Sequence, residues 1–263
     1  MLSIISTLTC LSVGVFYPLC FLIHARSPIK GGFHRFHLGM PLVVGGVPFV
    51  YLLMGPISSL TKTLLMVWFF SLALLTLFYW KKEYPQVHAI IVLSLFGLFA
   101  FIMTLFEFFF MGDAYISLLS CFLVNILAGS ILCASLHSMT LGHHYLNVRG
   151  LPIDHLKRAT NVLWALLGFR ILWDLYFLFF GKVLYRGDKI PIVHFLTSLD
   201  GFLLWIGIFF GIFLPFVALF FVKEILKFKN TQSATGILYI VLCSVLMGDL
   251  AYKYYLVKYG VAL

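Results

Sequence analysis

The chain has 263 residues, of which 62% are hydrophobic and only 10% are charged, and its mean hydropathy is +1.07. A soluble domain carries charge on about a quarter of its residues, so the composition excludes that class. The net charge of +9 comes from lysines and arginines spread over short loops, where positive charge sets topology and meets anionic lipid, so nucleic acid is rejected as a partner.

Apolar runs long enough to cross a hydrocarbon core of about 30 Å as a helix recur along the whole chain. A transmembrane β-barrel would alternate apolar and polar residues, and runs such as 90–111 do not alternate. The sequence therefore predicts an all-α transmembrane bundle of about eight spans, forming one integral membrane domain (1–263) without a soluble domain. The spans are expected at residues 3–23, 38–56, 60–80, 88–111, 115–137, 159–181, 194–222 and 234–257.

The first half of the chain predicts a retained first span, a kinked second span and a tight turn between spans four and five. No basic segment precedes the first span, so we expect it to be retained and not removed as a signal peptide. The second span contains Pro41, Pro48 and the pair Gly45-Gly46, which predict a kink or tilt. A turn at Gly112-Asp113 is expected to join spans four and five as a tight hairpin.

The second half contains a polar loop and one unusually long span. Residues 138–158 form the longest predicted loop. The length of the seventh run predicts tilt or a helical extension, and Gly207 and Gly211 on it predict a close helix–helix contact. Asn230 is predicted to cap the eighth span.

Orientation follows from the lysines and arginines on alternate loops. The loops after spans one, three, five and seven carry more of them than the loops on the other side. The positive-inside rule then places both termini outside, in what we expect to be a bacterial inner (cytoplasmic) membrane.

Four spans place a carboxylate in the same outer half of the predicted bundle. The four carboxylates are those of Glu107, Asp174, Asp200 and Asp249. Ionisable residues inside spans are costly, and they usually face a protein interior or a water-filled cavity. We therefore expect these four residues, with Arg170, to form a catalytic layer that moves protons or binds a quinone.

Arg170 and Asp174 are four residues apart on one helix, so they can also pair directly. An ion pair that only holds the bundle together remains an alternative to a catalytic site. Trp173 and Tyr176 lie on the same helix and are expected to line a cofactor cavity there.

The histidines concentrate on the opposite, inner side of the predicted bundle, with only His194 on the outer side. Neutral imidazole is a ligand for haem iron, zinc and copper. His137 and His144 are seven residues apart and share a face if the fifth span continues as a helix, which makes them candidate ligands of a b-type haem. The candidate metal ligands are His137, His143, His144 and His88. Interfacial histidines that contact lipid phosphates are the alternative.

These patterns leave three functional hypotheses open. The first is a non-autonomous membrane subunit of an oxidoreductase complex that handles quinone or protons, with haem b or quinone as cofactor and other subunits as partners. The second is a small proton- or cation-coupled transporter or channel, which predicts inverted repeats and broken helices. The third is a non-catalytic scaffold subunit, in which every polar residue is an assembly contact.

Overall fold

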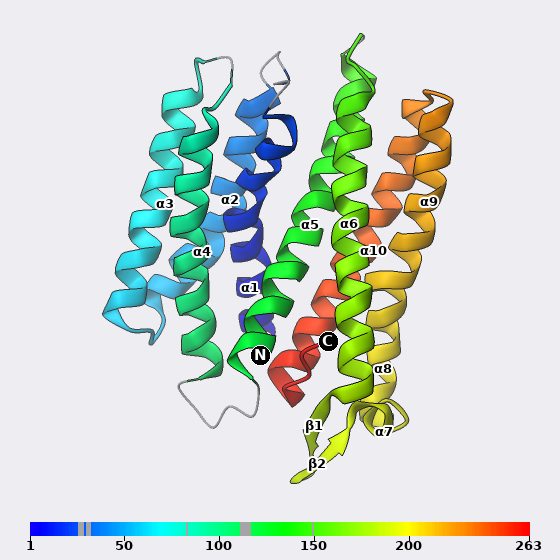
Figure 1. The fold of residues 1–263 in the computed structure, drawn as a ribbon. Helices are drawn as coiled ribbons and strands as arrows, with labels where there is room; N and C mark the ends of the chain where they lie inside the picture. The colour runs from blue at the N-terminus through cyan, green and yellow to red at the C-terminus, as the bar shows by residue number, and fades with distance from the viewer. Residues whose placement is uncertain (26–28, 30–32, 83, 111–116, 149) are drawn as a thin grey trace. The chain divides into compact units, whose positions relative to one another are not determined.

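The computed structural model describes residues 1–25, 29, 33–82, 84–110, 117–148 and 150–263. Within these residues, eight helical segments are long and apolar enough to cross a membrane, which confirms the predicted all-α bundle (Figure 1). By its internal contacts the chain divides into two compact units. The N-terminal unit is Ser6–Asp113, and the C-terminal unit is Met1–Ile5 together with Ala114–Leu263.

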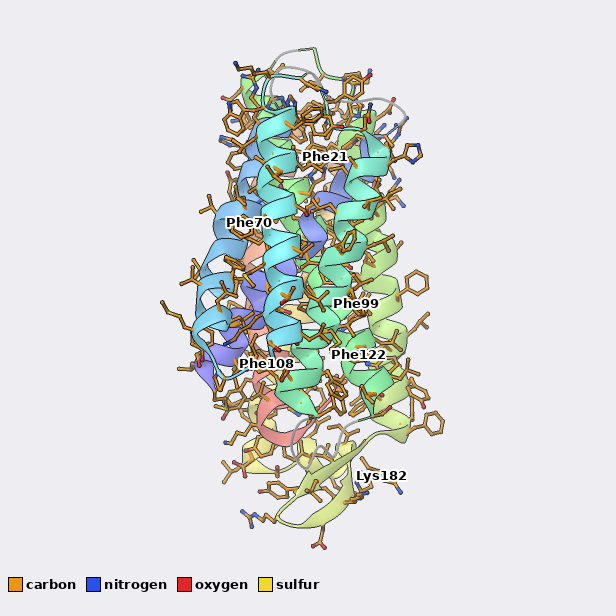
Figure 2. The ribbon with its side chains drawn as sticks, turned by 90° about the vertical axis from the view of Figure 1, so that its left-hand side faces the viewer. Phe21, Phe70, Phe99, Phe108, Phe122 and Lys182 are labelled. Carbon is orange, nitrogen blue, oxygen red and sulfur yellow. The ribbon has the colours of Figure 1, made fainter. Side chains whose placement is uncertain are left out.

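The N-terminal unit is built from four spans. They are α1 (Leu2–Phe16, which belongs to this unit from Ser6 on) continued by the 3-10 helix η1 (Tyr17–His24), α2 (Phe33–Met54), α3 (Ser59–Tyr79) and α4 (Val87–Phe109). α2 stays helical through Pro41 and Pro48. Exposed phenylalanines such as Phe70 and Phe99 cover the outside of α3 and α4, as expected for a surface in contact with lipid (Figure 2).

Trp68 of α3 fills the core of this unit and is only 1% exposed. Three glycines on α1, α2 and α4 make room for its indole ring. A Cβ atom would lie 3.0 Å from the ring at Gly14, 3.3 Å at Gly45 and 2.6 Å at Gly97. The unit thus packs around one large aromatic side chain because small residues on three neighbouring helices let it in.

The C-terminal unit contains the other spans and a small hairpin. Its elements are α5 (Leu118–Asn147), α6 (Asp154–Phe180), β1 (Lys182–Tyr185), β2 (Asp188–Pro191), α7 (Ile192–Leu196), α8 (Leu199–Ile208), the π-helical turn η2 (Phe209–Phe213), α9 (Leu214–Lys227) and α10 (Thr231–Tyr259). β1 and β2 pair antiparallel with Val183 opposite Ile190. α10 packs against α5, α8, η2 and α9, so it forms the centre of this unit (Figure 1).

Two predicted local features of this unit are confirmed. Gly211 lies against Gly248 of α10 so closely that a Cβ on either would collide with its surroundings, and Gly207 faces Ala251. Asn230 Oδ1 accepts a hydrogen bond of 3.0 Å from the Ser233 backbone N–H and caps α10.

The predicted loop 138–158 is wrong for most of its length. α5 continues to Asn147 and α6 already begins at Asp154. Hydropathy falls after residue 137, but the helix persists because its face is packed: Leu141 is fully buried, and Gly142 lies against Thr235 of α10.

The seventh run also differs from its prediction. It does not begin at 194 as one long helix, because the short α7 precedes a separate start at Leu199, which Ser198 caps by accepting a hydrogen bond from the Gly201 N–H. From there α8, η2 and α9 run on to Lys227 with the π turn in between. The predicted Gly112-Asp113 turn lies outside the described residues.

Candidate functional site

Four side chains of lysine, arginine, aspartate or glutamate are buried in the part of the chain that the structure describes, and all four lie in the C-terminal unit. Arg170 is 2% exposed, Asp174 4%, Asp249 4% and Lys253 2%. Removing each charge from water costs several kcal/mol unless partners compensate it. Each of these four residues therefore needs a buried partner of opposite charge.

Arg170 and Asp174 pair on α6, one helical turn apart. Arg170 Nε lies 3.0 Å from Asp174 Oδ1, although the two atoms are not aligned as a hydrogen bond. Tyr252 of α10 joins the pair: its hydroxyl donates to Asp174 Oδ2 at 3.1 Å, and its ring lies 4.2 Å from the guanidinium carbon. Tyr252 thus connects α6 to α10 through both a hydrogen bond and a cation–π contact.

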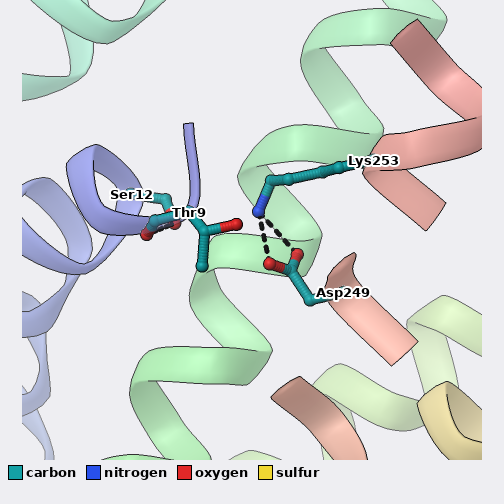
Figure 3. Close-up of polar contacts among 4 residues, drawn as sticks. All are labelled: Thr9, Ser12, Asp249 and Lys253. Atoms are coloured by element: carbon teal, nitrogen blue, oxygen red, sulfur yellow. Dashed lines mark hydrogen bonds and ion pairs between the residues drawn. The ribbon is translucent and has the colours of Figure 1, made fainter. Parts of the chain in front are cut away.

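Asp249 and Lys253 form the second pair, on α10. Lys253 Nζ donates to both carboxylate oxygens of Asp249, at 2.6 and 2.5 Å (Figure 3). The spacing of four residues places them on one helix face. With the α6 pair they give two buried cations and two buried anions, and this set, together with Tyr252, is called the ion-pair cluster below.

A small cavity of about 20 Å³ connects the two pairs. Its lining comes from α5, α6, η2 and α10, and comprises Ala128, Ile131, Arg170, Gly211, Val245, Asp249 and Tyr252. This volume admits about one water molecule and not an organic ring. Arg170 Nη2 is buried and has no hydrogen-bond partner among the described residues.

The wall that contains Gly211 is a π-helical turn. Such turns are rare, usually occur as single insertions in α-helices and are frequent at functional sites. Here the turn lies where Gly211 and Gly248 bring η2 and α10 into close contact. The backbone irregularity and the buried charges therefore coincide at one place in the C-terminal unit.

Two of the predicted acidic residues lie outside the ion-pair cluster. Asp200 is exposed at the start of α8, where its Oδ2 accepts a hydrogen bond of 2.8 Å from Tyr185 of the hairpin. That bond raises the pKa of the Tyr185 phenol. Glu107 belongs to the N-terminal unit and accepts hydrogen bonds from the Ser58 backbone N–H and the Thr61 hydroxyl at the start of α3. Asp200 thus holds the hairpin, and Glu107 caps a helix.

The predicted cofactor-lining aromatics lie apart from the cavity. Trp173 Nε1 donates to the Ala262 carbonyl at 2.9 Å, and the Tyr176 side chain is 56% exposed. Neither residue lines the small cavity. Trp173 contacts the C-terminal segment, and the Tyr176 ring packs against the rings of Trp173 and Phe180.

The candidate histidine ligands belong to both units and differ in their exposure. His137 is buried in α5, His143 is exposed with Nδ1 3.4 Å from the Tyr239 hydroxyl, and His88 belongs to the N-terminal unit. His137 and His144 both lie on α5, about 10 Å apart along its axis. Among the described residues, no group of three or more histidine, cysteine or carboxylate side chains is arranged to hold a metal ion.

The sequence reasoning missed Tyr252 and Gly248. Val245, Asp249 and Tyr252 are spaced by four and three residues, so they share one face of α10, and all three line the cavity. That spacing from an intramembrane acid was the available signal for Tyr252. Gly248 had no such signal, since its role depends on the approach of Gly211 from a different helix.

No protein-family model matches the chain, and no similarity to a curated protein or to a solved structure was found.

Proposed function

We propose that this protein is a proton-handling subunit of a quinone-linked membrane redox complex, and that the ion-pair cluster is the site where protons bind and leave. The observation that carries the proposal is the buried set of two ion pairs around one water-sized cavity. A hydrophobic replacement of a buried pair is often as stable as the pair itself, so packing alone does not call for four buried charges.

Each member of the cluster has a defined role in this proposal. Asp249 and Asp174 accept and release the proton, while Lys253 and Arg170 compensate the carboxylates when they are charged. A water in the cavity relays the proton between Asp249 and the Tyr252 hydroxyl, which already donates to Asp174. The cavity is too small for a quinone ring, so quinone chemistry takes place elsewhere in the complex, with electrons supplied by partner subunits.

The proposed setting is a bacterial cytoplasmic membrane with both termini outside. The excess of lysine and arginine on the loops after the odd-numbered spans supports this orientation. The eight apolar segments support a lipid bilayer as the surrounding medium.

A proton-coupled transporter is the second candidate, and the π-helical turn favours it. Transporters place ion sites at interruptions of transmembrane helices, and Gly211 in η2 lines the same cavity as Asp249. The two candidates share proton transfer through the cluster. They differ in whether proton movement follows quinol turnover or the uptake of a solute.

The test is proton movement through the purified protein in vesicles that contain a trapped pH-sensitive dye. A potassium diffusion potential supplies the driving force, and quinol is present or absent. We expect the wild-type protein to change the internal pH and the double variant Asp249→Leu/Lys253→Met to lose this activity while staying folded.

The matched control removes an ion pair outside the cluster. Glu224 and Lys227 pair on the surface of α9, with side chains 42% and 61% exposed. Glu224→Leu/Lys227→Met should leave proton movement unchanged. If the cluster variant and the wild type move protons equally, the cluster is an assembly contact and the scaffold hypothesis replaces the proposal.

A further inference from the structure

The hairpin that follows α6 carries basic residues that the proposed proton site does not use. Lys182, Arg186 and Lys189 are all exposed on it. In the proposed orientation the hairpin lies outside, which is the side where the positive-inside rule disfavours lysine and arginine. Membrane topology therefore does not account for these three charges.

The pairing of β1 with β2 divides the hairpin into two faces. Residues opposite each other in an antiparallel pair point to the same side, and the sides alternate along each strand. Val183 is buried, and Tyr185 contacts Phe195 and Asp200, so the face that contains Val183 and Tyr185 packs on the C-terminal unit. The opposite face points away from the unit and is called the lysine face below. It consists of Lys182, Leu184, Lys189 and Pro191.

The lysine face presents two neighbouring cations. The register of the strands makes Lys182 of β1 and Lys189 of β2 diagonal neighbours, with Cα atoms about 7–8 Å apart. Neither lysine forms an ion pair with any residue that the structure describes. Because a lysine side chain is long and flexible, both ammonium groups can reach one anionic group placed between them.

The other charged residues of the hairpin are associated with the packed face. Asp188 is paired with Tyr185, so its carboxylate is on the side away from the two lysines. The Arg186 guanidinium carbon lies 5.0 Å from the centre of the Tyr185 ring. The lysine face itself thus carries only positive charge, which matches an anion and offers no partner to the ammonium group of a zwitterion.

The hairpin is attached directly to helix ends that expose apolar side chains. Phe179 and Phe180 at the end of α6 are 79% and 72% exposed, and Leu199 at the start of α8 is 95% exposed. In a membrane-spanning helix such side chains contact lipid. Lys182 follows Phe180 by two residues, so their Cα atoms are at most about 7 Å apart, and Figure 2 shows Lys182 where the hairpin leaves α6. The lysine face therefore begins at the depth of the lipid phosphates.

We propose that the lysine face binds the headgroup of an anionic phospholipid, with Lys182 and Lys189 at its phosphate and with Phe179 and Phe180 against its acyl chains. Each lysine near an anionic membrane surface strengthens binding about fivefold, so two lysines give a preference of about 25-fold over a zwitterionic lipid. Only the choice of the outer leaflet rests on the proposed orientation. The headgroup class does not depend on the proton site.

The test is hydrogen exchange of the hairpin amides in the full-length protein, because this readout excludes basic loops elsewhere. A headgroup held by one lysine from each strand stabilises the closed hairpin and slows its exchange. The protein in a neutral detergent is titrated with phosphatidylglycerol or with phosphatidylcholine of the same acyl chains. We expect half-maximal protection of residues 182–190 at a concentration about 25-fold lower for phosphatidylglycerol.

Two double variants separate the charge of the lysines from their size. Lys182→Gln/Lys189→Gln should remove the preference for phosphatidylglycerol, and Lys182→Arg/Lys189→Arg should keep it. Both side chains are exposed, so we expect both variants to fold. The matched control is Lys223→Gln/Lys229→Gln, which removes two exposed lysines near the end of α9 and should also keep the preference.

Three outcomes contradict the proposal. Equal half-protecting concentrations of the two lipids in the wild type would overturn it, as would an unchanged preference in Lys182→Gln/Lys189→Gln. Protection by glycerol 3-phosphate at the same concentrations as by phosphatidylglycerol would overturn the lipid part, since a soluble anion makes no use of Phe179 and Phe180. None of these outcomes depends on whether the protein moves protons, so the two proposals can fail separately.

Discussion

The two units bury different kinds of side chain in their centres. In the N-terminal unit the centre is the indole of Trp68 surrounded by glycines, and the buried polar residues that the structure describes there are uncharged groups and histidines. In the C-terminal unit the centre contains Arg170, Asp174, Asp249 and Lys253. Both units are made of equally apolar helices, so overall hydropathy does not explain the difference.

The packing of the two centres is specified in different ways. Around Trp68, shape specifies the packing, because three glycines leave space for one aromatic ring. Around Asp249, charge specifies the packing, because each buried cation needs a buried anion within one helical turn. We therefore expect the N-terminal unit to respond to changes of volume and the C-terminal unit to respond mainly to changes of charge.

The largest expected effect is that of leaving one buried charge without its partner. Lys253→Met alone leaves Asp249 uncompensated and should lower the free energy of unfolding by about 3–5 kcal/mol. The double variant Asp249→Leu/Lys253→Met should recover most of this loss. Thermal unfolding in detergent measures both. Equal losses in the single and double variants would show that the lysine acts through packing and not through its charge.

The next effect compares steric crowding in the two units. Gly97→Ala places a Cβ 2.6 Å from Trp68 Nε1, and Gly248→Ala places one against the Gly211 backbone. Each change should cost about 1–3 kcal/mol. Hydrogen exchange should increase mainly in the N-terminal unit for Gly97→Ala and mainly in the C-terminal unit for Gly248→Ala.

Gly236→Ala is the matched control for both glycine variants. It lies on α10 like Gly248, but nothing lies within 4 Å of the new Cβ. Because alanine is the better helix former, this variant should be slightly more stable than the wild type. A loss in Gly236→Ala as large as that in Gly248→Ala would mean that crowding is not the cause.

A smaller effect is expected for the helix cap in the N-terminal unit. Glu107→Gln keeps an oxygen acceptor for the Ser58 N–H but removes the negative charge next to the start of α3. The expected loss is about 0.3–1 kcal/mol, the range for charges near helix termini. A midpoint of thermal unfolding lowered as far as in Lys253→Met would instead place Glu107 among the essential charges.

The smallest effect concerns the exposed pair of Tyr185 and Asp200. The hydrogen bond to the carboxylate raises the pKa of the Tyr185 phenol, so the bond is present at neutral pH and is lost as the pH rises through that raised pKa. Asp200→Asn should lower the pKa of Tyr185 without a measurable change in unfolding temperature. Tyrosine ¹³C NMR, with Tyr185→Phe for assignment, reports the titration, and an unchanged pKa would show that the bond is not formed in solution.

Several features of this protein were already determined by the sequence. The length of the apolar runs fixed the number and kind of spans, because a helix is the structure that satisfies its own backbone in lipid. The spacing of four residues already made an Arg170/Asp174 pair an alternative in the sequence, and the same spacing places Asp249 and Lys253 on one helix face. The Gly207/Gly211 contact followed from the same helical geometry.

Other features were decided only by the tertiary structure. The continuation of α5 past residue 137 depends on packing against α10, which hydropathy does not record. The exposure of Asp200 and the burial of Asp174 and Asp249 depend on where their helices lie within the C-terminal unit, although the three residues share a predicted depth. The contact of Tyr252 with the Arg170/Asp174 pair and the close approach of Gly211 to Gly248 arise between helices. Spacing along one helix carries no information about these features, because they depend on which faces of different helices meet.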